Sequence, residues 1–334
     1  MHSPLRVLIT GGTGFIGKRL ARQLLAQPML TLEGEAPRKI DKIILLDTFP
    51  ADDLPADPRL EVRIGEIDDS ALLDELTREV DLVWHLAAVV SSAAEADFEL
   101  GMQVNLHGLL ALLEAMRAQP KPARLVYASG FAIFGGPLPE VVGDGTLPTP
   151  VSSYGIQKAI GEMLINDYSR RGFVDGRTLR LPTIAVRPGK PNKAASTFVS
   201  SIIREPLVGE RAICPVTPET PVYITSPRRV LDAMLHAMAL DAERLGQSRI
   251  IPLPGLTVTI AQMVVALERV AGRATSQLIE WHEDAEIQRI VASWPSRVEA
   301  PRAAELGFHA DGDIESIIRA HVEDEGITVT GDRP

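Results

Sequence analysis

The chain of 334 residues contains one cysteine, Cys214, few aromatic residues and no excess of positive charge. A single cysteine excludes an intramolecular disulfide framework and fits a reducing compartment. Aromatic residues make up 4% of the sequence and the formal net charge is -10, so no basic surface interleaved with aromatics is present for a nucleic acid or an anionic membrane. We expect no nucleic-acid and no membrane partner.

The sequence also lacks a long hydrophobic run and a recognisable set of metal ligands. Its longest apolar stretches, such as 82–90, contain a histidine and fall far short of the ~20 residues that span a bilayer. The seven histidines form no His-Glu-x-x-His or Cys/His cluster, so we predict no metal site. The first apolar strand pattern starts at Leu5, which leaves no room for a signal peptide, so we expect a cytoplasmic protein.

A glycine-rich turn stands between a predicted strand and a predicted helix at the start of the chain. Residues 5–10 are apolar, and a helical pattern of leucines follows the glycines. The Gly-x-x-Gly-x-x-Gly spacing lets the backbone approach a pyrophosphate at a helix N-terminus. A glycine run can also be a simple tight turn, but these flanks favour dinucleotide binding. The predicted cofactor contacts here are Gly11, Gly14, Phe15, Ile16 and Gly17.

An acidic residue, Asp47, ends the second predicted strand, residues 42–47. A carboxylate in this place accepts the hydroxyls of the adenosine ribose and repels a 2′-phosphate, which selects NAD over NADP. The segment 28–41 is read as an insertion between helix and strand, because it makes the spacing longer than usual. The alternative is that Asp47 is a strand-end turn residue.

Further apolar strands are predicted at 60–64, 82–86, 124–129 and 178–182, with helices between them. This alternation predicts an α/β fold with a Rossmann doubly wound parallel sheet, whose ligands lie beyond the carboxyl ends of the strands. Asn105 is expected to begin a broadly apolar helix. The strand ends place Ser129 near the nicotinamide and add further candidate NAD contacts, namely Glu66, Ile67, Leu86, Ala87, Ala88 and Pro182.

Tyr154 and Lys158 are four residues apart, so on a helix both side chains lie on one face. A tyrosine titrates near pH ~10 and is a poor base at neutral pH, but a lysine ammonium beside it favours the phenolate. The pair is therefore a usable proton acceptor. Tyr-x-x-x-Lys also occurs by chance on solvated helix faces, so the surrounding motifs have to decide between the two interpretations.

These features, in this order, resemble the extended short-chain dehydrogenase/reductase family. The resemblance covers about the first 190 residues closely and is carried by residues 10–17 (TGGTGFIG), Asp47, 85–88 (HLAA), 104–108 (VNLHG) and the Tyr154/Lys158 pair. It implies NAD bound across the sheet, with Tyr154 as the acid/base and Lys158 bridging the nicotinamide ribose. It further implies a contribution of Asn105 to the cofactor site and a homodimer built from the Asn105 and Tyr154 helices.

One position departs from the family pattern. The family has a serine or threonine four residues before the aromatic of a Val-Tyr-Gly-like segment, and its hydroxyl holds the reacting substrate oxygen. Counting back four residues from Phe134 reaches Gly130, and Ser129 lies one residue earlier. A shift of one residue on a strand reverses the side-chain direction. Ser129 remains a catalytic candidate, with water, Ser91, Ser153 or the substrate itself as alternatives.

Within the family, residues 133–139, 180–184, 186–192 and 226–229 resemble those of a member that oxidises the carbon-2 hydroxyl of a four-carbon sugar acid. The loop 187–196 gathers Arg187, Lys190, Asn192 and Lys193 without matching acids, and arginine suits bidentate carboxylate binding. The alternative is a solvated basic loop. We predict a small-molecule sugar acid as substrate, contacted by Ser91, Ser129, Tyr154, Arg187 and Asn192.

We divide the chain into an NAD-binding Rossmann domain, 1–187, to which 227–255 return, and a smaller substrate-binding lobe, 188–226 and 256–330. Two other functions remain open. A nucleotide-sugar epimerase or dehydratase would recycle its hydride, although Thr183 stands where sugar-nucleotide members have an asparagine. A non-catalytic NAD-sensing protein is the second, although its signature would be a damaged Tyr/Lys pair.

Overall fold

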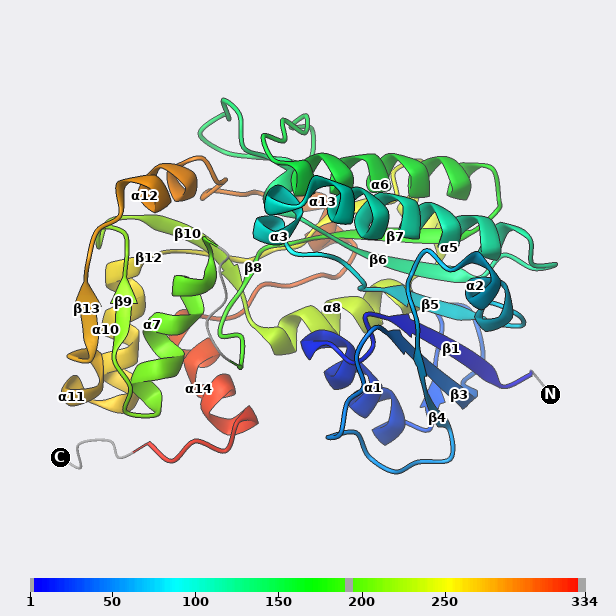
Figure 1. The fold of residues 1–334 in the computed structure, drawn as a ribbon, viewed down its shortest axis with the longest axis horizontal. Helices are drawn as coiled ribbons and strands as arrows, with labels where there is room; N and C mark the ends of the chain where they lie inside the picture. Colours follow the sequence, from blue (N-terminus) through cyan, green and yellow to red (C-terminus); the bar gives the residue numbers. More distant parts are fainter. Residues whose placement is uncertain (1–2, 190–194, 330–334) are drawn as a thin grey trace. The chain divides into compact units, whose positions relative to one another are not determined.

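The computed structural model describes residues 3–189 and 195–329, and the chain divides into two compact units (Figure 1). Unit 1 comprises Met1–Ser129, Ser152–Arg180 and Leu231–Ile251. Unit 2 comprises Gly130–Val151, Leu181–Val230 and Pro252–Pro334. The domain division drawn from the sequence stays a prediction; residues 130–151, which it placed in the NAD-binding domain, group with unit 2.

Unit 1 is built on a sheet with the strand order β11-β7-β6-β5-β1-β3-β2, in which β4 also pairs with β3. The pairs β1–β3, β1–β5, β3–β4 and β5–β6 are parallel. From β1 the chain builds first toward β3 and β4 and then toward β5 and β6, so the order reverses between β1 and β5. Doubly wound sheets bind ligands at this point, and the predicted Rossmann-type α/β fold is confirmed. The strands are β1 (Leu5–Thr10), β2 (Met29–Leu30), β3 (Arg38–Asp47), β4 (Leu60–Ile64), β5 (Leu82–His85), β6 (Arg124–Gly130), β7 (Asp175–Leu181) and β11 (Ile250–Pro252).

Helices cover both faces of this sheet (Figure 1). On one face Leu8, Val83 and Leu125 pack in a core with α2 (Ser70–Leu76), α5 (Gly108–Arg117) and α6 (Ser153–Arg170). The opposite face carries α1 (Phe15–Ala26) and α8 (Pro227–Ala239), and there the indole of Trp84 donates to the carbonyl oxygen of Met234 at 3.2 Å. Alternate residues of each strand therefore point to different helical layers.

The helix around Asn105 starts earlier than the sequence predicted. The chain is helical in α3 (Ser91–Ala96) and again in α4 (Phe98–Gly101), whose N-cap Asp97 accepts a hydrogen bond from the backbone of Leu100. Asn105 lies inside a π-helical turn, η1 (Met102–His107), that continues into α5. The prediction that Asn105 begins the helix is wrong, because the capping residue is Asp97. Such π-helical turns occur often at functional sites.

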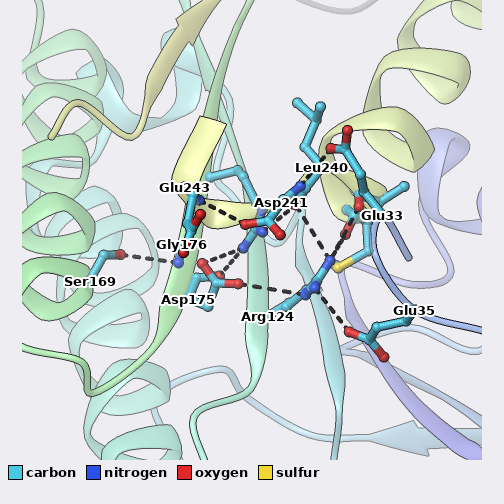
Figure 2. A network of polar contacts seen from close by, with 12 residues as sticks. Glu33, Glu35, Arg124, Ser169, Asp175, Gly176, Leu240, Asp241 and Glu243 are labelled. Atoms are coloured by element: carbon cyan, nitrogen blue, oxygen red, sulfur yellow. Dashed lines mark hydrogen bonds and ion pairs between the residues drawn. The ribbon is translucent and has the colours of Figure 1, made fainter. Parts of the chain in front are cut away.

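The inserted segment 28–41 forms a hairpin at the amino end of the sheet. Strand β2 pairs antiparallel with the start of β3, so β3 begins at Arg38 and is longer than predicted. Arg124, at the start of β6, donates to the carboxylate of Glu35 at 3.1 Å and to the carbonyl oxygen of Met238 at 3.1 Å. Figure 2 shows the contact between Arg124 and Glu35. Basic groups at a helix C-terminus stabilise its free carbonyls. Arg124 thus helps to cap α8, together with the backbone nitrogen of Glu33 in the insertion, which donates to the carbonyl oxygen of Ala239 at 2.7 Å. These contacts lie at the opposite end of the strands from the glycine turn.

Unit 2 has two small sheets and its own hydrophobic core. One sheet has the order β12-β10-β8 and the other pairs β13 with β9. Cys214 of β9 is fully buried and free, and Trp294 packs against the core. The strands are β8 (Thr183–Ile184), β9 (Ala212–Cys214), β10 (Pro221–Thr225), β12 (Leu256–Thr259) and β13 (Ile279–Trp281), and the larger helices are α7 (Thr197–Leu207), α10 (Ile260–Ala271), α12 (Ala285–Ala292) and α14 (Ile314–Asp324). None of the helices in the described parts of the chain has the length and apolar character that a membrane crossing requires.

Candidate active site

The three glycines of the turn after β1 serve different purposes. Gly11 has φ +67°, and a Cβ there would lie 2.7 Å from the backbone nitrogen of Ala87. A Cβ on Gly17 would lie 2.4 Å from the carbonyl oxygen of Gly11. Gly14, in contrast, is exposed, and a Cβ there would meet only the oxygen of Gly11, at 3.1 Å. Gly14 is also the N-cap of α1, and no side chain caps that helix.

The open face of Gly14 and the uncapped start of α1 suit an anionic group. Backbone N–H groups of the first helical turn carry partial positive charge and lack intrahelical acceptors. The first turn of α1 contains no acidic residue that would compete for them. The turn therefore fits the pyrophosphate of a dinucleotide such as NAD. The predicted contacts Phe15 and Ile16 are the first two residues of this helix.

The carboxylate of Asp47 lies beside the same turn. It accepts hydrogen bonds from the backbone nitrogen of Thr13 at 3.1 Å and from that of Thr48 at 2.8 Å. Asp47 thus organises the turn, as the structural alternative requires. A carboxylate has about four acceptor positions, so these two bonds leave capacity for ribose hydroxyls.

Asn105 holds the loop after β5 in place. It is 2% exposed, its Oδ1 accepts from the backbone nitrogen of Val89 at 2.9 Å, and its Nδ2 donates to the oxygen of Val89 at 3.1 Å. The same Nδ2 donates to Gln157 of α6 at 2.8 Å. Asn105 therefore ties the loop of Leu86, Ala87 and Ala88 to the helix that carries Tyr154.

Of the two NAD contacts predicted after β4, Glu66 is exposed and Ile67 is buried in the core. The Ile67 side chain packs against Gly108 of α5, where an added Cβ would lie 2.5 Å from Cγ2 of Ile67. Any contact of Ile67 with an adenine would have to use its main chain.

Tyr154 and Lys158 lie on α6, which starts where Ser152 accepts a hydrogen bond from the backbone of Gly155. Lys158 is 2% exposed, its Nζ donates to the carbonyl oxygen of Ala128 at 2.8 Å, and Nζ lies 5.6 Å from the centre of the Tyr154 ring. Burial lowers the pKa of Lys158 to about 7, although the negative charge of Glu162 acts in the opposite direction. The lysine therefore titrates close to neutral pH.

A row of buried polar side chains crosses the sheet beneath Lys158. Thr10, His85 and Tyr127 occupy matching positions on β1, β5 and β6. The Thr10 hydroxyl lies 2.6 Å from Nδ1 of His85, and the His85 and Tyr127 rings stack with centres 5.6 Å apart. Burial, with a smaller contribution from the Lys158 charge, lowers the pKa of His85 to about 3, and burial raises the pKa of Tyr127. Both rings are neutral at physiological pH.

The structure counts against Ser129 as the catalytic hydroxyl. Ser129 is 3% exposed, and its Oγ donates to Oε1 of Glu162 at 2.7 Å. Glu162 is fully buried and pairs with Arg180, with Nη2 2.7 Å from Oε2. The Ser129 hydroxyl thus faces α6 and a buried ion pair, and its catalytic role stays a prediction. Gly130 is extended, with φ -164°, and an added Cβ would make an ordinary contact with the oxygen of Leu181 at 3.5 Å.

The remaining predicted substrate residues lie in different parts of the chain. Ser91 is exposed and begins α3. Arg187 belongs to unit 2 and is exposed, and its backbone nitrogen donates to Ser200 Oγ at 3.0 Å. Pro182, a predicted NAD contact, belongs to the same unit and is buried. Asn192, like Lys190 and Lys193, lies outside the described residues. The substrate contacts of Arg187 and Asn192 stay predictions. Within residues 3–189 and 195–329 no group of His, Cys, Asp and Glu could hold a metal ion.

Sequence reasoning missed the polar residues behind the Tyr/Lys pair, chiefly Glu162 and Arg180. One signal was present: Glu162 follows Lys158 by four residues, as Lys158 follows Tyr154, so all three share one face of α6. The partner of Glu162, on β7, could not be read from local spacing.

Comparison with known proteins gives relatives along almost the whole chain. The chain is 51% identical to D-erythronate dehydrogenase of Cupriavidus necator over 324 residues, which cover 97% of this chain and 99% of the relative. It is 46% identical to D-erythronate dehydrogenase of Haemophilus influenzae, with 96% and 99% covered.

Solved structures with the same fold carry other descriptions. A nucleoside-diphosphate-sugar epimerase from Agrobacterium tumefaciens has a TM-score of 0.91 at 38% identity, covering 98% of this chain and 96% of that one. L-threonine 3-dehydrogenase from Trypanosoma brucei has a TM-score of 0.83 at 25% identity, with 98% and 99% covered. The resemblance drawn from the motifs is confirmed, and the family model for the NAD dependent epimerase/dehydratase family matches residues 7–231. The chain therefore belongs to the NAD dependent epimerase/dehydratase family.

Proposed function

We propose that this protein is an NAD-dependent dehydrogenase that oxidises the carbon-2 hydroxyl of a small sugar acid, D-erythronate, to the 2-keto acid. The observation that carries the proposal is the 51% and 46% identity, over almost the full chain, to two D-erythronate dehydrogenases. The intact Tyr154/Lys158 pair on α6 supports it, because an oxidation of this kind needs a proton acceptor.

The chain's own residues provide binding and proton transfer. The turn Gly11, Gly14 and Gly17 receives the pyrophosphate, and Asp47 receives the adenosine ribose hydroxyls. Tyr154, as phenolate, accepts the proton of the carbon-2 hydroxyl, and the Lys158 ammonium stabilises the phenolate. NAD supplies the acceptor for the hydride that leaves carbon 2.

A carboxylate substrate needs a cationic anchor, and we assign this to the loop that contains Arg187 and Asn192. Arginine offers a planar pair of donors that matches a carboxylate. The exposed side chain of Arg187 is in keeping with this role. The Ser129 hydroxyl donates its hydrogen bond to Glu162, so another group has to donate the second hydrogen bond to the carbon-2 oxygen. The candidates are water, Ser91, Ser153 and another group of the substrate.

The proposal includes a homodimer and a cytoplasmic location. Ile156, Ile160 and Met163 are 46%, 39% and 56% exposed along one side of α6, and Leu110 of α5 is 38% exposed. An apolar row of this kind on a surface helix is typical of an interface with a second copy. The free, buried Cys214 is consistent with a reducing compartment.

The decisive experiment follows NADH absorbance with a panel of four- to six-carbon aldonates that includes erythronate and threonate, with either NAD or NADP. NADH formation on the C4 acids alone supports the proposal. The 38% identity to a nucleoside-diphosphate-sugar epimerase motivates a second candidate, which would convert nucleotide sugars without net NADH. Product analysis with nucleotide sugars tests it. A non-catalytic NAD-binding protein would be silent in both assays.

A further inference from the structure

Three side chains on the sheet-facing side of α6 succeed one another at intervals of one helical turn: Tyr154, Lys158 and Glu162. Tyr154 is half-buried, whereas Lys158 is 2% exposed and Glu162 is fully buried. Side chains four residues apart on a helix have Cβ atoms about 5–6 Å apart, so Lys158 lies between Tyr154 and Glu162 along this face of the helix.

The strand that faces this helix contacts both charged groups with consecutive residues. The Tyr127 ring centre lies 4.6 Å from Nζ of Lys158, and the Ala128 carbonyl oxygen accepts the lysine hydrogen bond at 2.8 Å. The next residue, Ser129, donates to Glu162 at 2.7 Å. Three adjacent residues of β6 therefore hold Lys158 and Glu162 in fixed positions relative to each other.

The Glu162 carboxyl group accepts hydrogen bonds from two side chains. Arg180 of β7 approaches it through Nη2 at 2.7 Å from Oε2 and through Nε at 3.1 Å from Oε1. The hydroxyl of Ser129 supplies the other hydrogen bond. All three residues are buried. A buried carboxylate that receives a guanidinium and a hydroxyl has its desolvation offset by charge-assisted hydrogen bonds.

The charged and titratable groups that the described contacts place around Lys158 come from its own helix and from three strands. His85 comes from β5, Tyr127 from β6, Tyr154 and Glu162 from α6, and Arg180 lies behind Glu162 on β7. Burial keeps His85 neutral, with its pKa lowered to about 3. Burial also lowers the pKa of Lys158 to about 7, and Glu162 is the group that opposes this. The charge of Lys158 near neutral pH therefore depends on Glu162.

We propose that the buried Ser129–Glu162–Arg180 cluster holds the positive charge on Lys158 and so sets the pH range in which Tyr154 accepts a proton. Glu162 is a positioning residue in this scheme, because it acts through Lys158. The inference rests on the proposed roles of Tyr154 and Lys158.

The test measures the titration of Lys158 directly, without substrate. The chain has seven lysines, so a spectrum of the full protein labelled with ¹³C at lysine Cε has few signals, and Lys158→Arg identifies the one of interest. Glu162→Gln keeps the shape of the side chain and removes its charge. We expect the Lys158 midpoint to fall by roughly one to two pH units in this variant. Glu162→Asp keeps the charge and should keep the midpoint within about half a unit of the wild type.

An unchanged or raised midpoint in a folded Glu162→Gln protein would overturn the proposal, and so would an equal fall in Glu162→Asp. Removing one partner of a buried ion pair is strongly destabilising, so Glu162→Gln/Arg180→Gln provides a second protein without a stranded guanidinium. The proposal requires the Lys158 titration midpoint to fall in this double variant as well.

Kinetics then connect the titration to activity. NADH production by Glu162→Gln should decline at a pH lower than in the wild type by the same one to two units, whereas activity on the low-pH side should change less. Activity lost equally at every pH would contradict the scheme. If no aldonate yields NADH with the wild type, the proposed function fails, but the Lys158 midpoints can still be read.

Discussion

The Nζ atom of Lys158 donates to the carbonyl oxygen of Ala128 at 2.8 Å, so a main-chain atom of β6 fixes the ammonium in place. This bond uses one of the three lysine protons and leaves two for a ribose and for the phenol of Tyr154. Because a buried backbone carbonyl is the anchor, the position of the ammonium does not depend on a bound cofactor.

The first prediction concerns Tyr154. Tyr154→Phe removes the proton acceptor and leaves the glycine turn and Asp47 intact, so NADH formation should fall by about 10²–10⁴-fold while NAD affinity changes only a few-fold. Tyr168→Phe is the matched control, because Tyr168 lies on the same helix but its hydroxyl bonds to Glu114. Initial rates and NAD titrations of both variants check this. Turnover like the wild type in Tyr154→Phe would exclude the mechanism.

The second prediction separates two roles for Ser129. If the Ser129 hydroxyl serves only as a donor to Glu162, Ser129→Ala should lower the free energy of unfolding by about 1–2 kcal/mol and reduce turnover by less than about tenfold. A hydroxyl that held the reacting oxygen would cause a loss of about 10²-fold or more. The measurements are the denaturant midpoint and kcat. A large loss of kcat without a loss of stability would restore the catalytic assignment.

The third prediction addresses cofactor choice. Asp47→Asn removes the negative charge that repels a 2′-phosphate, so the ratio of kcat/KM for NADP to that for NAD should rise by about tenfold or more. Asp41→Asn is the control, since Asp41 is an exposed residue near the other end of the same strand. Equal ratios in the two variants would show that Asp47 serves only the turn, through Thr13 and Thr48.

The parts of the candidate site that could be predicted from the sequence are those that depend on local spacing. The glycine turn, Asp47 at a strand end and the Tyr154/Lys158 pair each follow from residues close together in the chain, and the structure places the three glycines, Asp47 and both members of the pair in one unit. The ion pair of Glu162 and Arg180 joins a helix to a strand, and no local pattern reports it. The direction of the Ser129 side chain could not be predicted either, because it depends on how β6 packs against α6.

The position of Asn105 shows a different limit. The apolar residues near Asn105 correctly predicted a helix, but the spacing of apolar residues does not show where a helix begins. The N-cap is Asp97, eight residues before Asn105. The π-helical turn that contains Asn105 has no sequence signature in a pattern of period 3.6. The structure shows that this turn places the Asn105 side chain in contact with Val89 and Gln157.

The fourth prediction tests the proposed dimer. Ile160→Glu places a charge in the exposed apolar row of α6, which should shift the protein from dimer to monomer in sedimentation at micromolar concentration. Val265→Glu is the control, because Val265 is 49% exposed on α10, outside that row. A protein that sediments as a monomer before any substitution would show that the row has another partner.

The fifth prediction concerns the buried His85. Its pKa is lowered by burial to about 3 from a usual 6.5, so between these values the unfolded chain binds a proton that the folded chain does not. Stability therefore falls as the pH falls through this window, by up to about 1.4 kcal/mol per pH unit, and the contribution is fully present above pH 6.5. His85→Asn retains a partner for Thr10 but does not titrate, so its stability should depend less on pH than that of the wild type. Denaturant unfolding from about pH 7 to about pH 4.5 measures the difference. His309→Gln, which replaces an exposed histidine, should retain the wild-type slope, and an equal slope in His85→Asn would exclude His85 as its source.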